Sequence, residues 1–598
     1  TFYAVNDTKN SSNFNAVVNK NNLIDNGNIS VNDSIIAVKD KSTGKISIVS
    51  RGDVTVKNTE LGGKTTIDAM DRNVAKNVTN EVVASNTVSE EEKFDLGNIS
   101  NWANFWDRVK CFFTGDVPHR VANGEVFSKT ETTTTTTKSN YDLVAGRGNV
   151  SLDNVNANDV DIKGANVKVA NSSFNKLNVA SSGTKTTSYT KQETTTTVSK
   201  KEADEFVVDE RSYFGVATKG HFNVDEVAPE VTTSTIADTI ATTTKTTEGL
   251  VSLDNVNTSD TVKISADRID MRNSIVNNID LIANVSDVNL DNVKATSDFV
   301  SEVKAKNNID VKSSQFKTIR AAAADITFTD TNVTKANVQA TNNITLKRTD
   351  SRKTYTVEDS TLVAGDSINA NNTNINDALM IAGNNVNANS SKIENANINA
   401  ESNVYANGAK VSNSVFKANN DIQVANGEVS NSTLTATKDL KLGNAKLNKV
   451  NAKGRYGFLN NATLENGTDV DVKTVTGTAY NDNDTVENLV IKNSKLKSTN
   501  NINLKNTIIE NGTLVTGKDV NIDTNSDVHL TGVKIGGDLN VTKARNLVIA
   551  NSREEGNKYI PSLTDKKSVT DYDRTKFDSN YFENIIGNYG RDYGNNTN

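Results

Sequence analysis

Side chains that commonly carry out catalysis or bind metals are sparse in this chain. It has one cysteine, Cys111, and three histidines, His119, His221 and His529, which lie far apart and without a catalytic motif around any of them. A single thiol forms neither an internal disulfide nor a thiolate metal cluster. The sequence also lacks a phosphate-binding loop, the spacing of zinc ligands and the glycine-rich calcium repeat. We therefore predict no catalytic residue, no metal site and no cofactor.

One pair of carboxylates forms the type of patch that an enzyme acting on polysaccharides could use. Asp267 and Asp270 lie in the stretch SADRID, which begins at Ser265. Enzymes that cleave glycosidic bonds use paired carboxylates, and those built on parallel β-helices gather them in a groove on one outer face. Aspartates scattered over a solvated face explain the same residues, and we prefer that interpretation. A carbohydrate-active enzyme, such as a tailspike-like depolymerase, is the alternative.

The backbone that would position such side chains repeats every eighteen residues. From Asp366 the blocks read DSINANNTNINDALMIAG, NNVNANSSKIENANINAE, SNVYANGAKVSNSVFKAN and NDIQVANGEVSNSTLTAT, followed by a shorter block. Two columns are apolar in every block, and most residues between the columns are polar. The third position gives Ile368, Val386, Val404, Ile422 and Leu440, and the tenth gives Ile375, Ile393, Val411, Val429 and Leu447.

This spacing predicts short strands that wind into a tube. Apolar residues two apart, separated by AN, NG or NS corners, indicate strands whose alternate side chains face inward, whereas a helix needs spacings of three and four. Three strands and three corners form one coil of a parallel β-helix, with neighbouring coils roughly 4.8 Å apart. We predict an all-β, elongated, single-stack, right-handed solenoid of twenty-odd coils, on the order of 100 Å long.

The asparagines at the corners have a structural explanation. Asn395, Asn413 and Asn431 occupy one column of the repeat. Asparagine tolerates the left-handed backbone conformation that tight corners need, and stacked amides can form hydrogen bonds along the axis. We prefer this interpretation of the column to a binding surface.

Two kinds of segment interrupt the repeat. Threonine-rich stretches begin at Lys129, Thr184 and Val231, and their β-branched side chains favour extra strands outside the tube over disorder or a glycosylated stalk. The stretch NISNWANFWDRVKCFFTGD has the spacing of a short helix. Its apolar face is a candidate partner-binding surface, although packing against the solenoid is the preferred interpretation: Trp102, Phe105, Trp106, Val109 and Phe113.

These patterns divide the chain into five parts. We expect N-terminal coils over 1–90, the aromatic helical insertion over 91–128, and coils with threonine-rich outer strands over 129–248. Regular coils are expected over 249–555, and an irregular cap or linker over 556–598. The formal net charge of −7 gives a nucleic-acid partner no electrostatic support, and no apolar run is long enough for a transmembrane helix.

The coil sequences resemble a known family. RGDVTVKNTEL, KDVNIDT, GDLNVTK and the threonine-rich lead into GRGNVSLDNVNANDVDIKGANVKVANSS are similar to the repeats of filamentous haemagglutinin-like exoproteins, the secreted members of two-partner secretion systems. The resemblance implies an adhesin, filament or stalk on the bacterial cell surface, exported through an outer-membrane transporter. Its expected partner is a receptor or glycan on a host or neighbouring cell, and it implies end-to-end or lateral self-association. The delivery stalk of a larger contact-dependent toxin is a further alternative.

Overall fold

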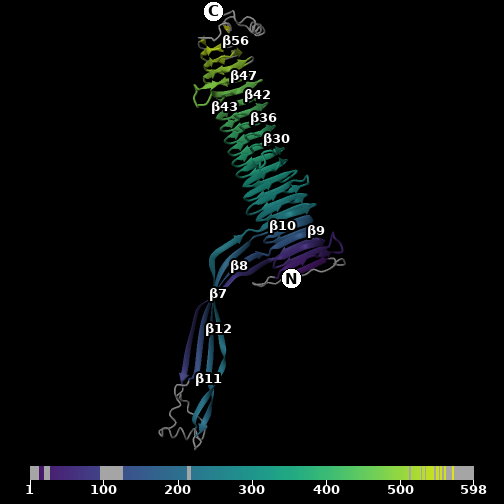
Figure 1. Ribbon diagram of the computed structural model, residues 1–598, viewed down its shortest axis with the longest axis vertical. Coiled ribbons are helices and arrows are strands. Elements are labelled where there is room, and N and C mark those ends of the chain that lie inside the picture. Colours follow the sequence, from purple (N-terminus) through teal and green to yellow (C-terminus); the bar gives the residue numbers. More distant parts are fainter. Residues whose placement is uncertain are drawn as a thin grey trace.

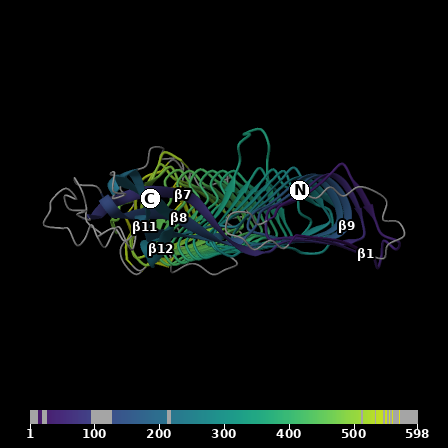
Figure 2. The ribbon, with the colours of Figure 1, turned by 90° about the horizontal axis from the view of Figure 1, so that it is seen from below.

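The chain forms a long rod of stacked strands from which a ribbon projects (Figure 1). The computed structural model describes these residues: 13–18, 27–93, 126–211, 217–510, 513–526, 528–531, 534–535, 537–544, 547–550, 553–554, 558–559 and 569–570. Across these residues the structure is all-β, and parallel strands stack into a solenoid of about 23 turns. The predicted β-solenoid is confirmed. Viewed from one end, the rungs overlie one another as a tube (Figure 2).

Each regular coil contributes three short strands. One coil holds β29 (Ile368–Asn369), β30 (Asn374–Asn376) and β31 (Leu379–Ala382). The next coil holds the three strands that pair with them in parallel, namely β32 (Val386–Asn387), β33 (Lys392–Glu394) and β34 (Asn397–Ala400). The pairing follows the sequence repeat, because each residue faces the one eighteen positions later.

The apolar columns are the inside of the tube. Ile368 pairs with Val386, and Ile375 pairs with Ile393. All ten residues of the third and tenth columns are at most 2% exposed. Their side chains belong to one apolar cluster that runs without a break from Ala16 to Leu547. The solenoid therefore has a single core, which no coil could build alone.

Asparagines at the corners take the left-handed conformation. The φ angles of Asn395, Asn413 and Asn431 are 51°, 48° and 45°. A buried serine follows two of them, and it satisfies backbone groups inside the corner. The Ser414 hydroxyl donates to the Ser412 carbonyl at 2.7 Å and accepts the Ala396 N–H at 3.1 Å. In an NS corner, the asparagine thus adopts the turn conformation, and the serine forms hydrogen bonds to the backbone groups that the turn leaves without partners.

Stacked amides run along the axis in other columns. The Asn403 amide donates to Asn385 Oδ1 at 2.9 Å. In a second column, the backbone N–H of Asn389 donates to Asn371 Oδ1 and that of Asn407 donates to Asn389 Oδ1, both at 2.8 Å. Asparagine is therefore frequent for two reasons, backbone conformation and axial hydrogen bonds, and some residues serve both. Asn444, with a φ angle of 57°, donates its side-chain amide to Asn426 Oδ1 at 3.0 Å.

The three threonine-rich segments and residues 71–93 form a four-stranded antiparallel ribbon, in the order β12 (Ala217–Thr247), β11 (Thr184–Arg211), β8 (Val126–Arg147) and β7 (Asp71–Lys93). The predicted extra strands are confirmed. Residues 71–90, which the repeat assigned to the first coils, belong to β7 of this ribbon. Alternation with period two is common to ribbon strands and coil strands, so the pattern alone does not distinguish them.

The ribbon is inserted without breaking the stack. β5 (Val54–Gly62) pairs in parallel with β9 (Val150–Gly164), although β7 and β8 lie between them in sequence. Likewise β10 (Val167–Ser181) pairs directly with β13 (Leu250–Thr258). The predicted helix and its five apolar residues lie outside the described residues, as does nearly all of 556–598; of 91–128, residues 91–93 belong to β7 and 126–128 to β8.

Because the core depends on inward side chains, truncating one of them should destabilise the stack. Phe416 in β37 (Val415–Ala418) is fully buried, whereas its neighbour Val415 is 46% exposed. We expect Phe416→Ala to lower the free energy of unfolding by about 3 to 5 kcal/mol, and Val415→Ala to lower it by about 0.5 kcal/mol or less. Urea unfolding followed by circular dichroism measures both. Equal losses for the two variants would contradict the burial pattern.

Candidate functional site

The two aspartates that suggested an enzyme make structural contacts. Asp267 Oδ2 accepts the backbone N–H of Gly183 at 2.9 Å and that of Gly249 at 2.7 Å, where the second half of the ribbon leaves and rejoins the solenoid. Asp270 Oδ1 accepts the Asn289 amide at 2.6 Å and the Arg268 guanidinium at 3.3 Å. Asp267 therefore fastens the ribbon, and Asp270 joins neighbouring coils.

Where the ribbon joins the solenoid, the backbone at Gly183 lies so close to the backbone at Thr247 that residue 183 has no room for a side chain. A Cβ added to Gly183 would overlap the carbonyl oxygen of Thr247, whereas one added to Gly443 would have its nearest neighbour at 3.6 Å. We expect Gly183→Ala to lower the temperature at which the ribbon loses protection from protease, and Gly443→Ala to leave it unchanged. Limited proteolysis during thermal unfolding separates these outcomes. Equal stability of the two variants would refute the proposed tight crossing.

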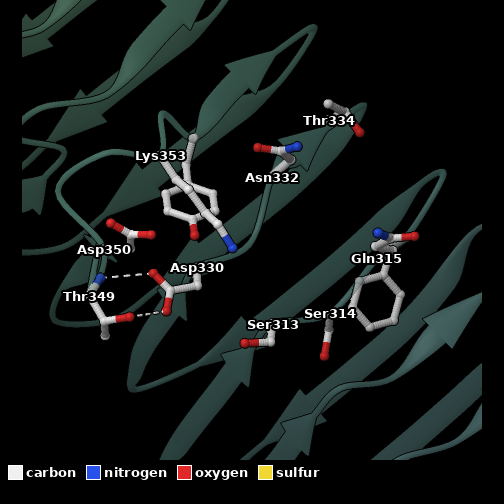
Figure 3. A pocket seen from close by; sticks show the side chains of 11 residues that line it. Ser313, Ser314, Gln315, Asp330, Asn332, Thr334, Thr349, Asp350 and Lys353 are labelled. Atoms are coloured by element: carbon white, nitrogen blue, oxygen red, sulfur yellow. Dashed lines mark hydrogen bonds between the residues drawn. The ribbon is translucent and has the colours of Figure 1, made fainter.

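One hollow in the rod's surface lies beside an enlarged corner between β26 (Ile344–Lys347) and β27 (Thr356–Glu358) (Figure 3). The cavity has a volume of about 500 Å³ and is lined mostly by hydroxyl, amide and charged groups. Asp330 accepts the Thr349 N–H at 2.8 Å and the Thr349 hydroxyl, and these bonds lower the pKa of Asp330. Burial and the Asp330 charge raise the pKa of Tyr355. Asp330 thus remains ionised and holds the enlarged corner in place.

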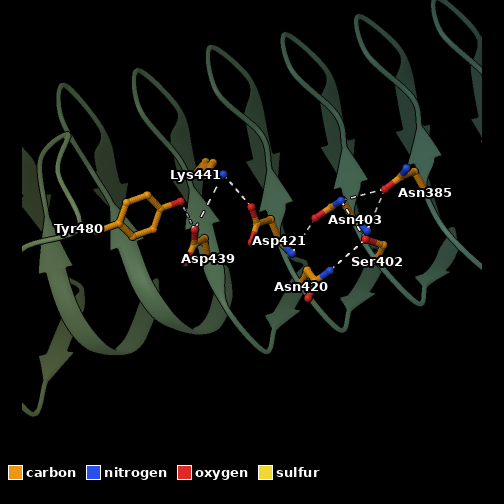
Figure 4. A network of polar contacts seen from close by, with 8 residues as sticks. All are labelled: Asn385, Ser402, Asn403, Asn420, Asp421, Asp439, Lys441 and Tyr480. Atoms are coloured by element: carbon orange, nitrogen blue, oxygen red, sulfur yellow. Dashed lines mark hydrogen bonds and ion pairs between the residues drawn. The ribbon is translucent and has the colours of Figure 1, made fainter.

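A second hollow is lined by Tyr480, which lies on the loop between β45 (Asp469–Thr476) and β46 (Thr485–Glu487). Figure 4 shows Tyr480 with the polar residues around it. The Tyr480 hydroxyl donates to Asp439 Oδ2 at 2.6 Å, while 63% of the residue stays exposed. Its ring meets those of Tyr456 and Phe458 edge to face, with centroids 5.4 and 5.1 Å apart. This cluster of three aromatic rings beside the Asp439 carboxylate marks the best candidate site.

Beneath the tyrosine, charges of opposite sign compensate one another. Lys441 Nζ lies 2.7 Å from Asp421 Oδ2 and 3.8 Å from Asp439 Oδ2. Burial alone would lower the pKa of Lys441, but its hydrogen bond to Asp421 and the surrounding negative charges raise it. The hydrogen bond to Asp439 raises the pKa of Tyr480. Lys441 therefore stays cationic and Tyr480 stays neutral, as a rigid binding surface requires.

The network continues along the axis as a row of amides. The backbone N–H of Asp421 donates to Asn403 Oδ1 at 3.1 Å, and the Asn420 amide donates to Ser402 Oγ at 2.9 Å (Figure 4). Together with Asn385, these groups form a polar track that spans several coils and ends at Tyr480. Hydroxyl-rich ligands suit such a track, because amides and carboxylates offer both donors and acceptors.

Asp484 holds the tyrosine loop. Its Oδ2 accepts the backbone N–H groups of Gly477, Thr478 and Ala479 at 2.8 to 3.0 Å, together with the Thr476 hydroxyl. Burial opposes ionisation, but these four hydrogen bonds prevail and lower the pKa of Asp484 to about 2. The carboxylate is therefore ionised at every physiological pH, and it orders the loop that positions Tyr480.

The lowered pKa of Asp484 gives the loop a defined acid sensitivity. Its stabilisation is complete above the unfolded-state pKa of about 4 and is lost as the pH falls through the folded value of about 2. We expect hydrogen-exchange protection of the Gly477, Thr478 and Ala479 amides to decline only in that range. At neutral pH, Asp484→Ala should reduce it about tenfold. Asp482→Ala, which removes one hydrogen bond to Thr474, is the control. Similar effects of both variants would argue against Asp484 as the anchor.

Of the cysteine and the three histidines, the structure describes the strands that carry two. Cys111 and His119 lie outside the described residues, while His221 and His529 belong to β12 and β53 (Val528–Thr531). Over the described ranges, no group of three or more histidine, cysteine or carboxylate side chains is arranged to hold a metal ion. The same residues include no helix that is long and apolar enough to cross a membrane.

Tyr480, Asp439 and Lys441 were not identified from the sequence. The available signal was a break in the repeat, since the stretch from 477 to 484 does not fit the coil spacing. No family model matches this chain, and a search of curated proteins finds no match. The molecule is thus defined by its fold, a parallel β-solenoid with an inserted four-stranded ribbon and an aromatic cluster on one flank.

Proposed function

We propose that this chain is an extracellular bacterial surface rod, an adhesin or stalk that holds binding features away from the cell and serves attachment. The observation that supports this most directly is the single apolar core, which runs from Ala16 to Leu547 without dividing into lobes. A stack of this kind gains length with each coil while its width stays constant. Such a protein can therefore hold a binding feature at a distance from the cell surface.

The distribution of irregular features supports the same proposal. Each coil needs only its inward residues for stability, so loops and insertions are tolerated on the outside. The ribbon, the corner near Tyr355 and the loop of Tyr480 all occur there. Outward elements on a regular scaffold are where binding functions usually reside.

The resemblance of the coils to filamentous haemagglutinin-like repeats supports location and export. In this proposal the chain crosses the outer membrane through a transporter and folds outside, with a receptor or glycan on another cell as its partner. The arrangement of the candidate site favours binding over hydrolysis, because its two carboxylates already have partners. Asp421 forms an ion pair with Lys441, and Asp439 accepts a hydrogen bond from Tyr480. An acid catalyst requires a carboxyl group that is free to exchange a proton with its substrate.

Attachment can be tested with beads that display the whole chain. We expect these beads to adhere to bacterial or epithelial cell layers more than beads that display a globular protein of equal net charge. Negative-stain electron micrographs should show rods on the order of 100 Å. Adhesion no greater than the control, or release of reducing ends from a polysaccharide panel, would contradict the proposal.

A further inference from the structure

Three basic residues, Lys438, Arg455 and Lys473, lie on successive coils beside the aromatic cluster. The Arg455 backbone N–H donates to the Lys438 carbonyl at 2.6 Å, so these residues occupy adjacent coils. On the other side, Gly454 pairs with Val472 and Tyr456 pairs with Thr474, which places Arg455 opposite Lys473. All three side chains are exposed. We call Lys438, Arg455 and Lys473 the cationic ladder.

The carboxylates beside the ladder, Asp421 and Asp439, are bonded to Lys441 and Tyr480. Neighbouring cations are paired, Lys441 with Asp421 at 2.7 Å and Lys497 with Asp469 at 2.8 Å. Within the described residues, by contrast, no side chain of the ladder makes an ion pair. Like charges directly opposite one another on adjacent strands destabilise a sheet. A bound anion with charges at matching intervals would relieve this repulsion.

Next to the ladder lies a hollow of about 380 Å³ that combines aromatic and polar walls. Arg455 and Lys438 line it together with Tyr456 and Tyr480, and the Arg455 guanidinium lies 5.4 Å from the centroid of the Tyr456 ring. Aromatic faces and edges pack against the apolar faces of sugar rings, while amides and carboxylates bond to hydroxyls. Asn403 and Asn420 supply the amides, and Asp421 and Asp439 supply the carboxylates.

We propose that the cationic ladder and this hollow bind an acidic polysaccharide, a chain of sugars that carry carboxylate or sulfate groups. The ligand lies along the solenoid axis, with its anionic groups on the ladder and a sugar ring against Tyr456 and Tyr480. The coil spacing of roughly 4.8 Å is close to the length of one sugar unit in an extended chain. This proposal rests on the proposed attachment function and names its ligand class.

A glycan fits these observations better than a nucleic acid. The basic surface spans only three coils, and the chain as a whole carries a formal net charge of −7. Non-specific nucleic-acid binding draws most of its affinity from many phosphate contacts, which so short a ladder does not supply. The amide track beside Tyr480 offers paired donors and acceptors for hydroxyl groups, which sugars carry on nearly every carbon.

The test compares two triple variants of the whole chain. The first is Lys438→Gln, Arg455→Gln and Lys473→Gln. The control is Lys392→Gln, Lys410→Gln and Lys446→Gln, which removes the same charge from another sheet, where each lysine has a glutamate partner. Binding is measured by biolayer interferometry with polygalacturonate, dextran sulfate, neutral dextran and single-stranded DNA as probes. Circular dichroism checks that both variants keep the fold.

We expect one or both acidic polysaccharides to bind, with dissociation constants raised about tenfold or more by the ladder variant and less than about twofold by the control. Tyr480→Ala should weaken glycan binding and leave the fold intact. Equal effects of both triple variants, equal binding of neutral dextran, tighter binding of DNA, or no binding of either acidic probe would each overturn the proposal. Adhesive beads combined with absent glycan binding would refute the ligand class alone, whereas non-adhesive beads would refute the attachment function.

Discussion

The structure depends on the stacking of apolar rungs in parallel register. A single coil of eighteen residues places only a few side chains inward, and it buries them only when coils lie above and below. Ile368, Val386 and Val404 illustrate this dependence, because each is fully buried by its neighbours in the column. The backbone hydrogen bonds between coils enforce the same register. Stability is therefore shared along the rod.

This constraint restricts the residue types at inward positions and leaves those at outward positions free to vary. Inward positions require small or branched apolar residues, although their identity changes from coil to coil. Outward positions carry no such requirement, so the solenoid accepts the ribbon between β5 and β9 and the loop that carries Tyr480. The ribbon and the Tyr480 loop arise at these tolerated interruptions, whereas Arg455 and Lys473 of the cationic ladder lie on strands of the stack itself.

Polar residues complete the coil because a tube of tight corners would otherwise leave backbone groups without partners. Asn413 adopts the left-handed turn, and Ser414 bonds to backbone groups of its own coil and the preceding one. Asp267 does the same at the ribbon junction, where two glycine N–H groups meet one carboxylate. Of the two aspartates that looked most like an enzyme's carboxylates, Asp267 thus serves the backbone, and Asp270 holds the Asn289 and Arg268 side chains.

The sequence by itself determined the strands, their period and the inward columns, because a repeat of eighteen residues records its own register. It also indicated that the threonine-rich segments lie outside the tube. Only the tertiary structure decided that residues 71–90 join the ribbon, since period two suits both arrangements. It alone brought Tyr480 to Asp439, which is 41 positions earlier in the chain. Local patterns record which face a residue takes, but contacts between coils depend on how loops of different length return to the stack.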